Sequence, residues 1–180
     1  AVIRELFEET GILLARASDG NWPDNVACYA EQRMAVDRCE LAWPDFLRSE
    51  GFCMPVDALH YFAWWITPVN SPKRWTTRFF ATALPPGQNA KHDCKELTDS
   101  GWLRPKDALQ SGLAGQIKLP QPTRRTLDLM KDFESVDELL EWAAGQHRTG
   151  ITSSWPVQVF VDGKEMYPIP GDQHYPEPMQ

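Results

Sequence analysis

The sequence predicts a mixed α/β (α+β) fold, because helix and strand signals alternate along a chain of 180 residues. Residues 59–67 and 74–84 are rich in aromatic residues and Thr, which favour strands, and Pro and Ser-Pro lie between them. Ser135 is followed three residues later by Glu138, a capping box that predicts a helix start. The length is sufficient for one domain with a hydrophobic core.

The acidic first segment predicts a helix over residues 1–10, and Gly11 is expected to end it with a positive φ. Residues 12–14 read as a short buried strand. Residues 17–57 predict a helical insertion between two strands of the fold, because turn residues and capping residues alternate with apolar ones. The expected helices in it run from a cap at Asp24 or Asn25 to about Cys39, and from Asp45 to about Ser49, where Gly51 follows.

The rest of the chain predicts two adjacent strands and then helices. Pro near the first turn is compatible with a helix over 122–133. Asp162-Gly163 is a hairpin turn signal. The expected elements are strands 59–67 and 74–84, a loop at 85–89, a strand over 96–103, a helix opening at 105–109, helix 122–133, a helix from Ser135 to about Ala144 closed by Gly145, and strands 155–161 and 166–169.

Composition excludes several classes of function. The net charge of −7 disfavours nucleic-acid binding. No apolar run approaches the roughly 18 residues that span a bilayer, so we expect no membrane segment. The four Cys form no Cys-x-x-Cys pair and no zinc-ligand spacing, which predicts reduced thiols in a cytoplasmic protein, with two disulfides as the alternative. The oligomeric state stays open.

The most informative stretch carries three carboxylates at i, i+3 and i+4, namely Glu5, Glu8 and Glu9. On a helix these positions are neighbours, so the like charges repel each other unless a cation lies among them. Mg²⁺ is such a cation, because it takes oxygen ligands from carboxylates and substrate phosphates. We therefore expect the three side chains to converge on one cleft. The alternative is an ordinary helix start, where acidic residues favour the helix dipole.

The order of these residues resembles the second half of the Nudix box, G-x5-E-x7-R-E-U-x-E-E-x-G-U, where U is bulky and aliphatic. The matching positions are Arg4, Glu5, Leu6, Glu8, Glu9, Gly11 and Ile12. Only three residues precede Arg4, so we expect the first half of the box to lie upstream and the domain to be incomplete at its N-terminus.

Later segments resemble the coenzyme A diphosphatase-like branch of this superfamily, which has a helical insertion after the box. Residues 65–68 and 74–80 are similar to that branch's W-I-T-P and R-F-D-T-R-F-F segments, with Trp75 and Thr76 in place of Phe-Asp. Residues 96–105, 119–123 and 170–175 also look like this branch. The resemblance implies one Nudix domain over residues 1–180, an α/β/α sandwich on a mixed sheet that lacks its first strands.

The resemblance implies metal-dependent hydrolysis of a diphosphate by water. Glu8 and Glu9 match the family's ligands for Mg²⁺ or Mn²⁺. Glu5 matches the carboxylate that orients or deprotonates water, often beside a metal. Arg4 matches the arginine that holds the catalytic glutamate through a charge-assisted hydrogen bond. A solvated arginine is the alternative for Arg4.

Other candidates are less specific. Glu96 is the candidate for an extra acidic ligand, with Asp99 as its rival. Arg78 is a candidate phosphate clamp, or the partner of an acidic neighbour. Trp65 is a candidate for stacking on adenine, as are Trp64 and Trp75, although core packing is expected for at least two of the three. His92 is a candidate base or a solvated loop residue.

The expected substrate is a nucleotide diphosphate, in first place coenzyme A or an acyl-CoA. An ADP-ribose or nucleotide-sugar diphosphatase is the runner-up. A catalytically inactive Nudix-like binding module is the rival from another class. Because the first half of the box is expected upstream, we expect this chain by itself to hydrolyse such a substrate weakly or not at all.

Overall fold

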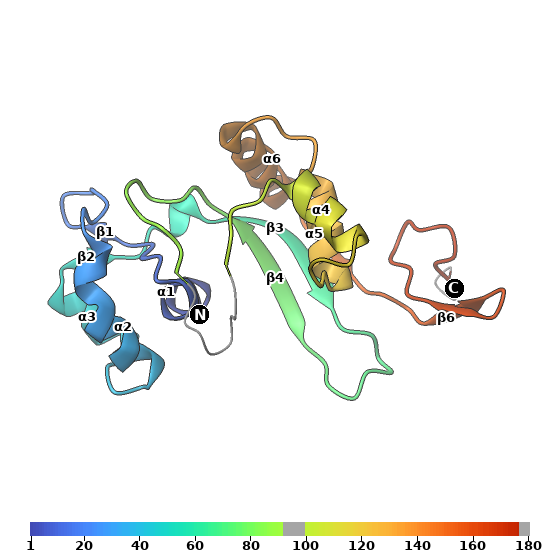
Figure 1. Cartoon of the computed structure of the whole chain (residues 1–180), viewed down its shortest axis with the longest axis horizontal. Helices are drawn as coiled ribbons and strands as arrows, with labels where there is room; N and C mark the ends of the chain where they lie inside the picture. Colours follow the sequence, from blue (N-terminus) through green and yellow to red (C-terminus); the bar gives the residue numbers. More distant parts are fainter. Residues whose placement is uncertain (92–99, 177–180) are drawn as a thin grey trace. The chain divides into compact units, whose positions relative to one another are not determined.

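The computed structural model describes residues 1–91 and 100–176 (Figure 1). The chain forms two compact units, which are described separately. Unit 1 comprises Ala1–Leu59 with Ala83–Trp102, and unit 2 comprises His60–Thr82 with Leu103–Gln180. Each unit has its own cluster of buried apolar side chains. Helices and a mixed sheet are both present, which confirms the predicted α/β class.

Unit 1 is mostly helical, with one small antiparallel strand pair, β1 with β2. Its elements are α1 (Val2–Thr10), β1 (Arg16–Ala17), the 3-10 helix η1 (Val26–Tyr29), α2 (Ala30–Asp37), α3 (Trp43–Ser49), β2 (Phe52–Cys53) and the 3-10 helix η2 (Val56–Ala58). Phe7 of α1 stacks on Phe46 of α3 with ring centroids 5.5 Å apart. Leu13 and Leu14 complete the centre of this core.

Helix α1 confirms the predicted first helix. Ile3 and Phe7 are buried, since they lie four residues apart on one face. Gly11 follows with φ 73, and its amide donates to the carbonyl of Phe7. The left-handed conformation costs glycine little because it has no Cβ.

The expected strand at residues 12–14 is wrong: the segment is buried, but it joins no sheet. The backbone N–H of Leu13 donates to Oε1 of Gln88 at 2.8 Å, and Nε2 of Gln88 donates to the carbonyl of Leu13 at 3.1 Å. The buried side-chain amide thus takes the place of a neighbouring strand. Both backbone groups are satisfied without a ladder.

The predicted helices of residues 17–57 are present: the first starts after Asn25 as expected, whereas its end and the start of the second differ. The first begins as η1 and continues as α2, which ends at Asp37 rather than Cys39. The second, α3, begins at Trp43 instead of Asp45, because Pro44 is tolerated in the first turn of a helix.

Unit 2 contains a sheet of three strands in the order β4-β3-β5. Its elements are β3 (His60–Ile66), β4 (Thr76–Ala81), α4 (Pro105–Leu113), α5 (Gln121–Met130), α6 (Val136–Thr149), β5 (Ser153–Ser154), β6 (Val159–Val161) and β7 (Lys164–Met166). β3 pairs with β4 antiparallel and with β5 parallel, so the sheet is mixed. Phe62, Trp65 and Ala143 form its core, where α6 packs against β3.

Helix α6 confirms the serine cap of the predicted capping box, whereas the Glu138 carboxylate accepts from the amide of Glu134 and not of Ser135. The structure also corrects the predicted end of the helix. The Ser135 hydroxyl accepts a hydrogen bond from the Glu138 amide at 3.2 Å. The helix continues through Gly145 and ends before Gly150, which has φ 90. Glycine inside a helix costs only about 1 kcal/mol, which packing of Ala143 in the core can offset.

The remaining strand predictions are partly confirmed. Asp162 and Gly163 both have positive φ and join β6 to β7, as predicted for a hairpin. Both strands are shorter than expected. Of the expected strand over 96–103, residues 100–103 are irregular and the others lie outside the described residues.

Cys28, Cys39 and Cys53 are free and exposed, as expected for reduced thiols. Cys94 lies outside the described residues. Among the helices of residues 1–91 and 100–176, none combines the length and apolar character needed to cross a bilayer.

Candidate functional site

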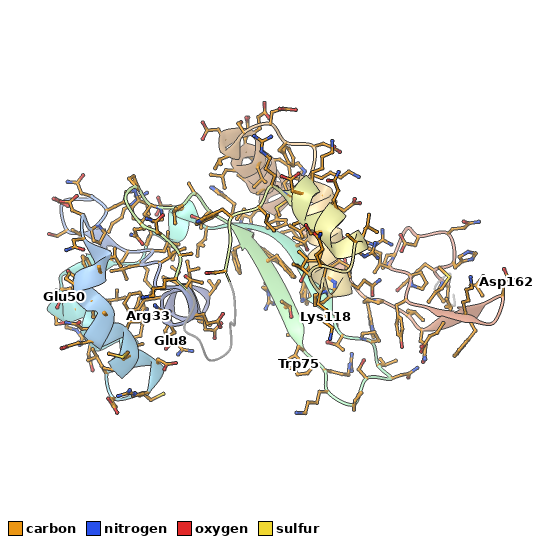
Figure 2. All side chains as sticks on the ribbon, viewed as in Figure 1. Glu8, Arg33, Glu50, Trp75, Lys118 and Asp162 are labelled. Atoms are coloured by element: carbon orange, nitrogen blue, oxygen red, sulfur yellow. The ribbon has the colours of Figure 1, made fainter. Side chains whose placement is uncertain are left out.

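Helix α1 positions the acidic residues of the motif within unit 1. Figure 2 shows Glu8 of this helix near Arg33 of α2. The side chain of Glu8 is only 10% exposed, whereas that of Glu5 is 52% exposed. The helix therefore presents one shielded carboxylate and one that faces solvent, and the two have different electrostatic surroundings.

Arg4 contacts its predicted partner Glu5, but it binds Glu8 more closely. Its Nη1 donates to both carboxylate oxygens of Glu8, at 2.6 and 2.8 Å. The contact to Oε1 of Glu5, made by Nη2, is longer at 3.4 Å. Residues four apart on a helix face one another and adjacent residues do not, which explains the preference. The guanidinium is shared between the two carboxylates.

The expected convergence of Glu5, Glu8 and Glu9 is not present. Within residues 1–91 and 100–176, no group of three or more Asp, Glu, His or Cys side chains is arranged to hold a metal ion. Glu8 has Arg4 as its counter-ion. The donor chemistry nevertheless fits Mg²⁺ or Mn²⁺, because all three side chains offer hard oxygen ligands from successive turns of one helix.

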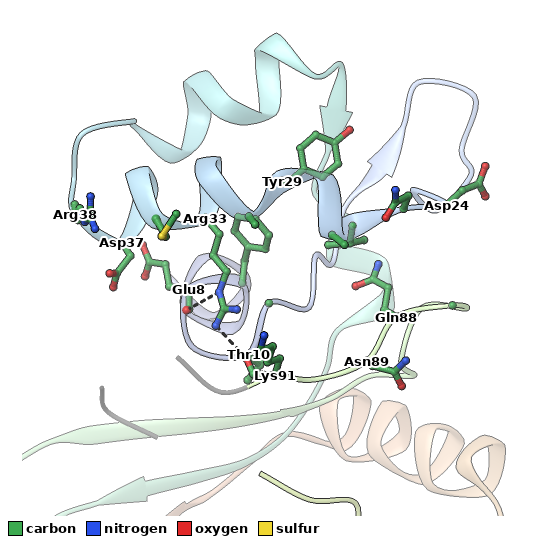
Figure 3. A pocket seen from close by; sticks show the side chains of 18 residues that line it. Glu8, Thr10, Asp24, Tyr29, Arg33, Asp37, Arg38, Gln88, Asn89 and Lys91 are labelled. Atoms are coloured by element: carbon green, nitrogen blue, oxygen red, sulfur yellow. Dashed lines mark hydrogen bonds between the residues drawn. The ribbon is translucent and has the colours of Figure 1, made fainter. Parts of the chain in front are cut away.

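A cavity of about 630 Å³ lies beside the last turn of α1 (Figure 3). Three parts of unit 1 line it: residues 7–11 around the end of α1, residues 24–38 in η1 and α2, and residues 87–91. The volume is within the range of small-molecule sites, which is roughly 300–1,000 Å³. Glu8 belongs to this lining, so the motif helix borders the cavity.

Arg33 joins the three parts of the cavity wall. Its Nε donates to the backbone carbonyl of Glu8 at 3.0 Å, and its Nη2 donates to that of Lys91 at 3.1 Å (Figure 3). The last carbonyls of a helix have no partner within the helix, so Arg33 satisfies one of them. A Cβ on Gly11 would lie 2.9 Å from Nη1 of Arg33.

The end of α1 is closed by two more contacts. The amide of Lys91 donates to the carbonyl of Thr10 at 2.7 Å. The Thr10 hydroxyl donates to the carbonyl of Leu6 at 2.6 Å and accepts from the amide of Ile12 at 3.2 Å. Sequence reasoning found neither Arg33 nor Lys91, because both act on a helix that is distant in sequence and no local pattern marks them.

Tyr29 forms an uncharged part of the cavity wall. Burial raises the pKa of its phenol above the usual value of 10.0, and interactions with the neighbouring Cys28 and Glu50 raise it further. The phenol is therefore neutral at physiological pH. Its ring packs edge-on against Phe46 and Phe52, which holds it in place.

The predicted site residues Arg78, Trp65 and Trp75 belong to unit 2. The Arg78 guanidinium lies over the Trp64 ring, 5.2 Å from the centroid. Trp65 is buried in the core, and it also borders a second cavity of about 400 Å³ together with Arg125. Trp75 is exposed. Glu96, Asp99 and His92 lie outside the described residues.

Comparison with known proteins gives related sequences and a related structure. The family model described as the NUDT19 Nudix domain matches residues 1–130. A protein of Xenopus laevis named acyl-coenzyme A diphosphatase NUDT19 is 30% identical over 189 residues, which cover 97% of this chain and 50% of the relative. The human protein of that name is 26% identical over 188 residues, with the same coverage of 97% and 50%.

The crystal structure of a Nudix hydrolase from Alicyclobacillus acidocaldarius aligns with a TM-score of 0.62 and 21% identity. The alignment covers 77% of this chain and 63% of that chain. At this identity the likeness establishes the fold, which agrees with the predicted one. The chain spans about half the length of the curated relatives that it matches.

Proposed function

The chain belongs to the NUDT19 Nudix domain family, and from this premise we propose that the protein hydrolyses the diphosphate bond of a coenzyme A-type substrate. The observation that carries the proposal is the position of Glu8, whose shielded carboxylate borders a cavity of ligand size. The names of the relatives, which are acyl-coenzyme A diphosphatases, support this choice of substrate.

The proposed roles follow the motif. Glu8 and Glu9, with Glu5, hold Mg²⁺ or Mn²⁺, and Glu96 is proposed as a further ligand from its position in the sequence. When bound, the cation neutralises charge on the phosphate oxygens. Glu5 orients or deprotonates the attacking water. Its exposure to solvent and its weaker contact with Arg4 leave its oxygens accessible for this role.

Arg4 is proposed to hold the glutamates in position. Its two short contacts with Glu8 restrict the rotamers of that side chain, and the third contact reaches Glu5. Such charge-assisted hydrogen bonds have both strength and direction. The arginine therefore organises two carboxylates from one point of the helix.

We further propose that residues 17–57 are an insertion within a single Nudix domain. This segment supplies η1, α2 and α3, and its residues form one wall of the cavity beside Glu8. Arg78 and Trp65 are proposed to contact substrate in unit 2, where Trp65 borders the second cavity.

The test replaces Glu8 by Gln in the full-length protein. We expect kcat for release of adenosine 3′,5′-bisphosphate from coenzyme A to fall about 10²-fold or more, because a metal ligand contributes several kcal/mol to transition-state stabilisation. Binding of Mn²⁺, followed by its electron paramagnetic resonance signal, should weaken in parallel. Glu31→Gln, an exposed carboxylate on α2, is the matched control.

The outcome is unambiguous if both variants are checked for folding by thermal unfolding. Unchanged turnover and unchanged Mn²⁺ binding in Glu8→Gln would refute the assignment. A wild-type protein that is folded, binds Mn²⁺ and releases no product from coenzyme A would refute the substrate.

A further inference from the structure

We propose that the cavity between the end of α1, the η1–α2 segment and residues 87–91 binds the pantetheine arm of the substrate. This arm is the uncharged, amide-containing chain on one side of the diphosphate. The inference rests on the proposed function and deepens it, because it assigns one part of the substrate to one part of the fold. The cavity of about 630 Å³ is large enough for such a chain (Figure 3).

One wall of the cavity is an apolar stripe. Val26, Ala30 and Met34 follow each other at intervals of four residues along η1 and α2, and all three line the cavity. The side chain of Met34 is 48% exposed although it belongs to a helix with a buried face. Apolar groups aligned on an accessible surface indicate a ligand or partner. The methyl groups of a pantetheine arm are suitable for this wall.

The charges of the cavity favour an uncharged ligand. Three cationic residues line it, Arg33, Arg38 and Lys91, and so do three carboxylates, Glu8, Asp24 and Asp37. Arg33 directs two of its donors to backbone carbonyls. A site for the 3′-phosphate end of coenzyme A would instead require a surplus of free cations. Because positive and negative side chains are equal in number, we assign the pantetheine arm, and not the phosphorylated ribose, to this cavity.

Residues 87–91 offer one polar partner for the amides of the arm, Asn89. Asn89 is exposed, lines the cavity, and makes no side-chain hydrogen bond to the described part of the chain. Its amide can both donate and accept, which matches a peptide-like group. Gln88 is not available, because both ends of its amide bind Leu13.

The proposed metal ligand and the apolar stripe line the same cavity. Glu8, the proposed metal ligand, belongs to the part of the lining that α1 contributes. A diphosphate held there has its next bonded group directly beside the cavity. The insertion thus supplies a specificity site next to the proposed reaction centre.

The direct probe is pantetheine itself, which carries no phosphate and needs no metal. In the full-length protein with ¹³C-labelled Met methyl groups and EDTA, pantetheine should shift the Met34 methyl resonance in a saturable manner. Ala30→Trp fills the apolar wall and should weaken this binding at least tenfold. Ala42→Trp, at an exposed alanine outside the cavity, is the matched control and should leave it unchanged.

The kinetic arm compares coenzyme A with ADP-ribose, which shares the adenosine diphosphate and lacks the pantetheine arm. Ala30→Trp should lower kcat/KM for coenzyme A at least tenfold and change that for ADP-ribose less than twofold. Pantetheine that leaves Met34 unshifted, or equal losses on both substrates, would overturn the inference. Because pantetheine binding is measured without turnover, this result is separate from the Glu8→Gln test of the reaction.

Discussion

At the scale of single residues, Gly11 combines two requirements. It takes φ 73 at the end of α1, and Nη1 of Arg33 approaches to within 2.9 Å of the position that a Cβ would occupy. The first requirement is a property of the backbone and can be inferred from the helix end. The second depends on a side chain from another helix.

The two requirements can be separated by substitution. Gly11→Ala should destabilise unit 1 by about 1–2 kcal/mol for the positive φ, and by about 1 kcal/mol more because Arg33 must leave its carbonyl partners. Gly20→Ala, at φ 84 with no atom within 4 Å of its Cβ position, is the control for the backbone term alone. Urea unfolding measures both. Equal losses of unfolding free energy in Gly11→Ala and Gly20→Ala would show that displacing Arg33 costs no stability.

At the scale of elements, Arg33 connects α2 to two other segments. It satisfies backbone carbonyls of Glu8 in α1 and of Lys91 after the turn that contains Gln88. Helix α2 is therefore hydrogen-bonded, through Arg33, to the backbone carbonyl of Glu8, the proposed metal ligand. We expect these hydrogen bonds of Arg33 to affect the position of α1 and not to take part directly in the hydrolysis step.

Arg33→Met keeps the aliphatic stem and removes the donors. It should lower the free energy of unfolding by about 1.5–3 kcal/mol, because the part-buried carbonyl of Glu8 and the exposed carbonyl of Lys91 both lose a charged partner. Hydrogen exchange should increase in the last turn of α1. Arg38→Met is the control, because Arg38 is exposed and makes no side-chain hydrogen bond or ion pair to the described residues. This substitution should change the free energy of unfolding by less than about 0.5 kcal/mol.

If Arg33 positions α1, its loss should lower kcat more than it raises KM. Equal rates of hydrogen exchange in α1 of Arg33→Met and of Arg38→Met would argue against a role of Arg33 in holding this helix.

At the scale of the whole molecule, each of the two units has its own apolar core. In unit 1, Phe7, Trp43 and Phe46 contact one another through their rings. In unit 2, Phe62 packs on Trp142 with ring centroids 5.5 Å apart. We therefore expect a substitution in one core to destabilise mainly the unit that contains that core.

Phe46→Ala tests the core of unit 1. Removing this fully buried ring should cost about 3–5 kcal/mol and should raise hydrogen exchange first in α1, α2 and α3. Phe160→Ala, at a ring that is 71% exposed, is the matched control and should change stability by less than about 0.5 kcal/mol. A uniform increase in exchange over β3, β4 and α6 in Phe46→Ala would contradict separate cores.

Much of the fold was predictable from local patterns. Helix α1, the glycine that ends it and the capping box at Ser135 depend on residues within a few positions of one another. The antiparallel pairing of β3 and β4 likewise follows from two aromatic segments that are close in sequence and joined by the loop of residues 67–75. The motif also identified the family, because its order of Arg, Glu, Gly and aliphatic residues is specific.

The sequence by itself determined which helix carries the carboxylates, and the tertiary structure alone decided how they are held. Residues 12–14 avoid a strand because Gln88, 75 positions away, satisfies Leu13. Arg33 reaches the carbonyl of Glu8 across 25 positions and shapes the cavity. The spacing of residues within one helical turn determines the backbone preference of a segment. The partners of buried polar groups, in contrast, come from segments that are distant in sequence and meet only in the packed structure, so no short sequence pattern encodes them.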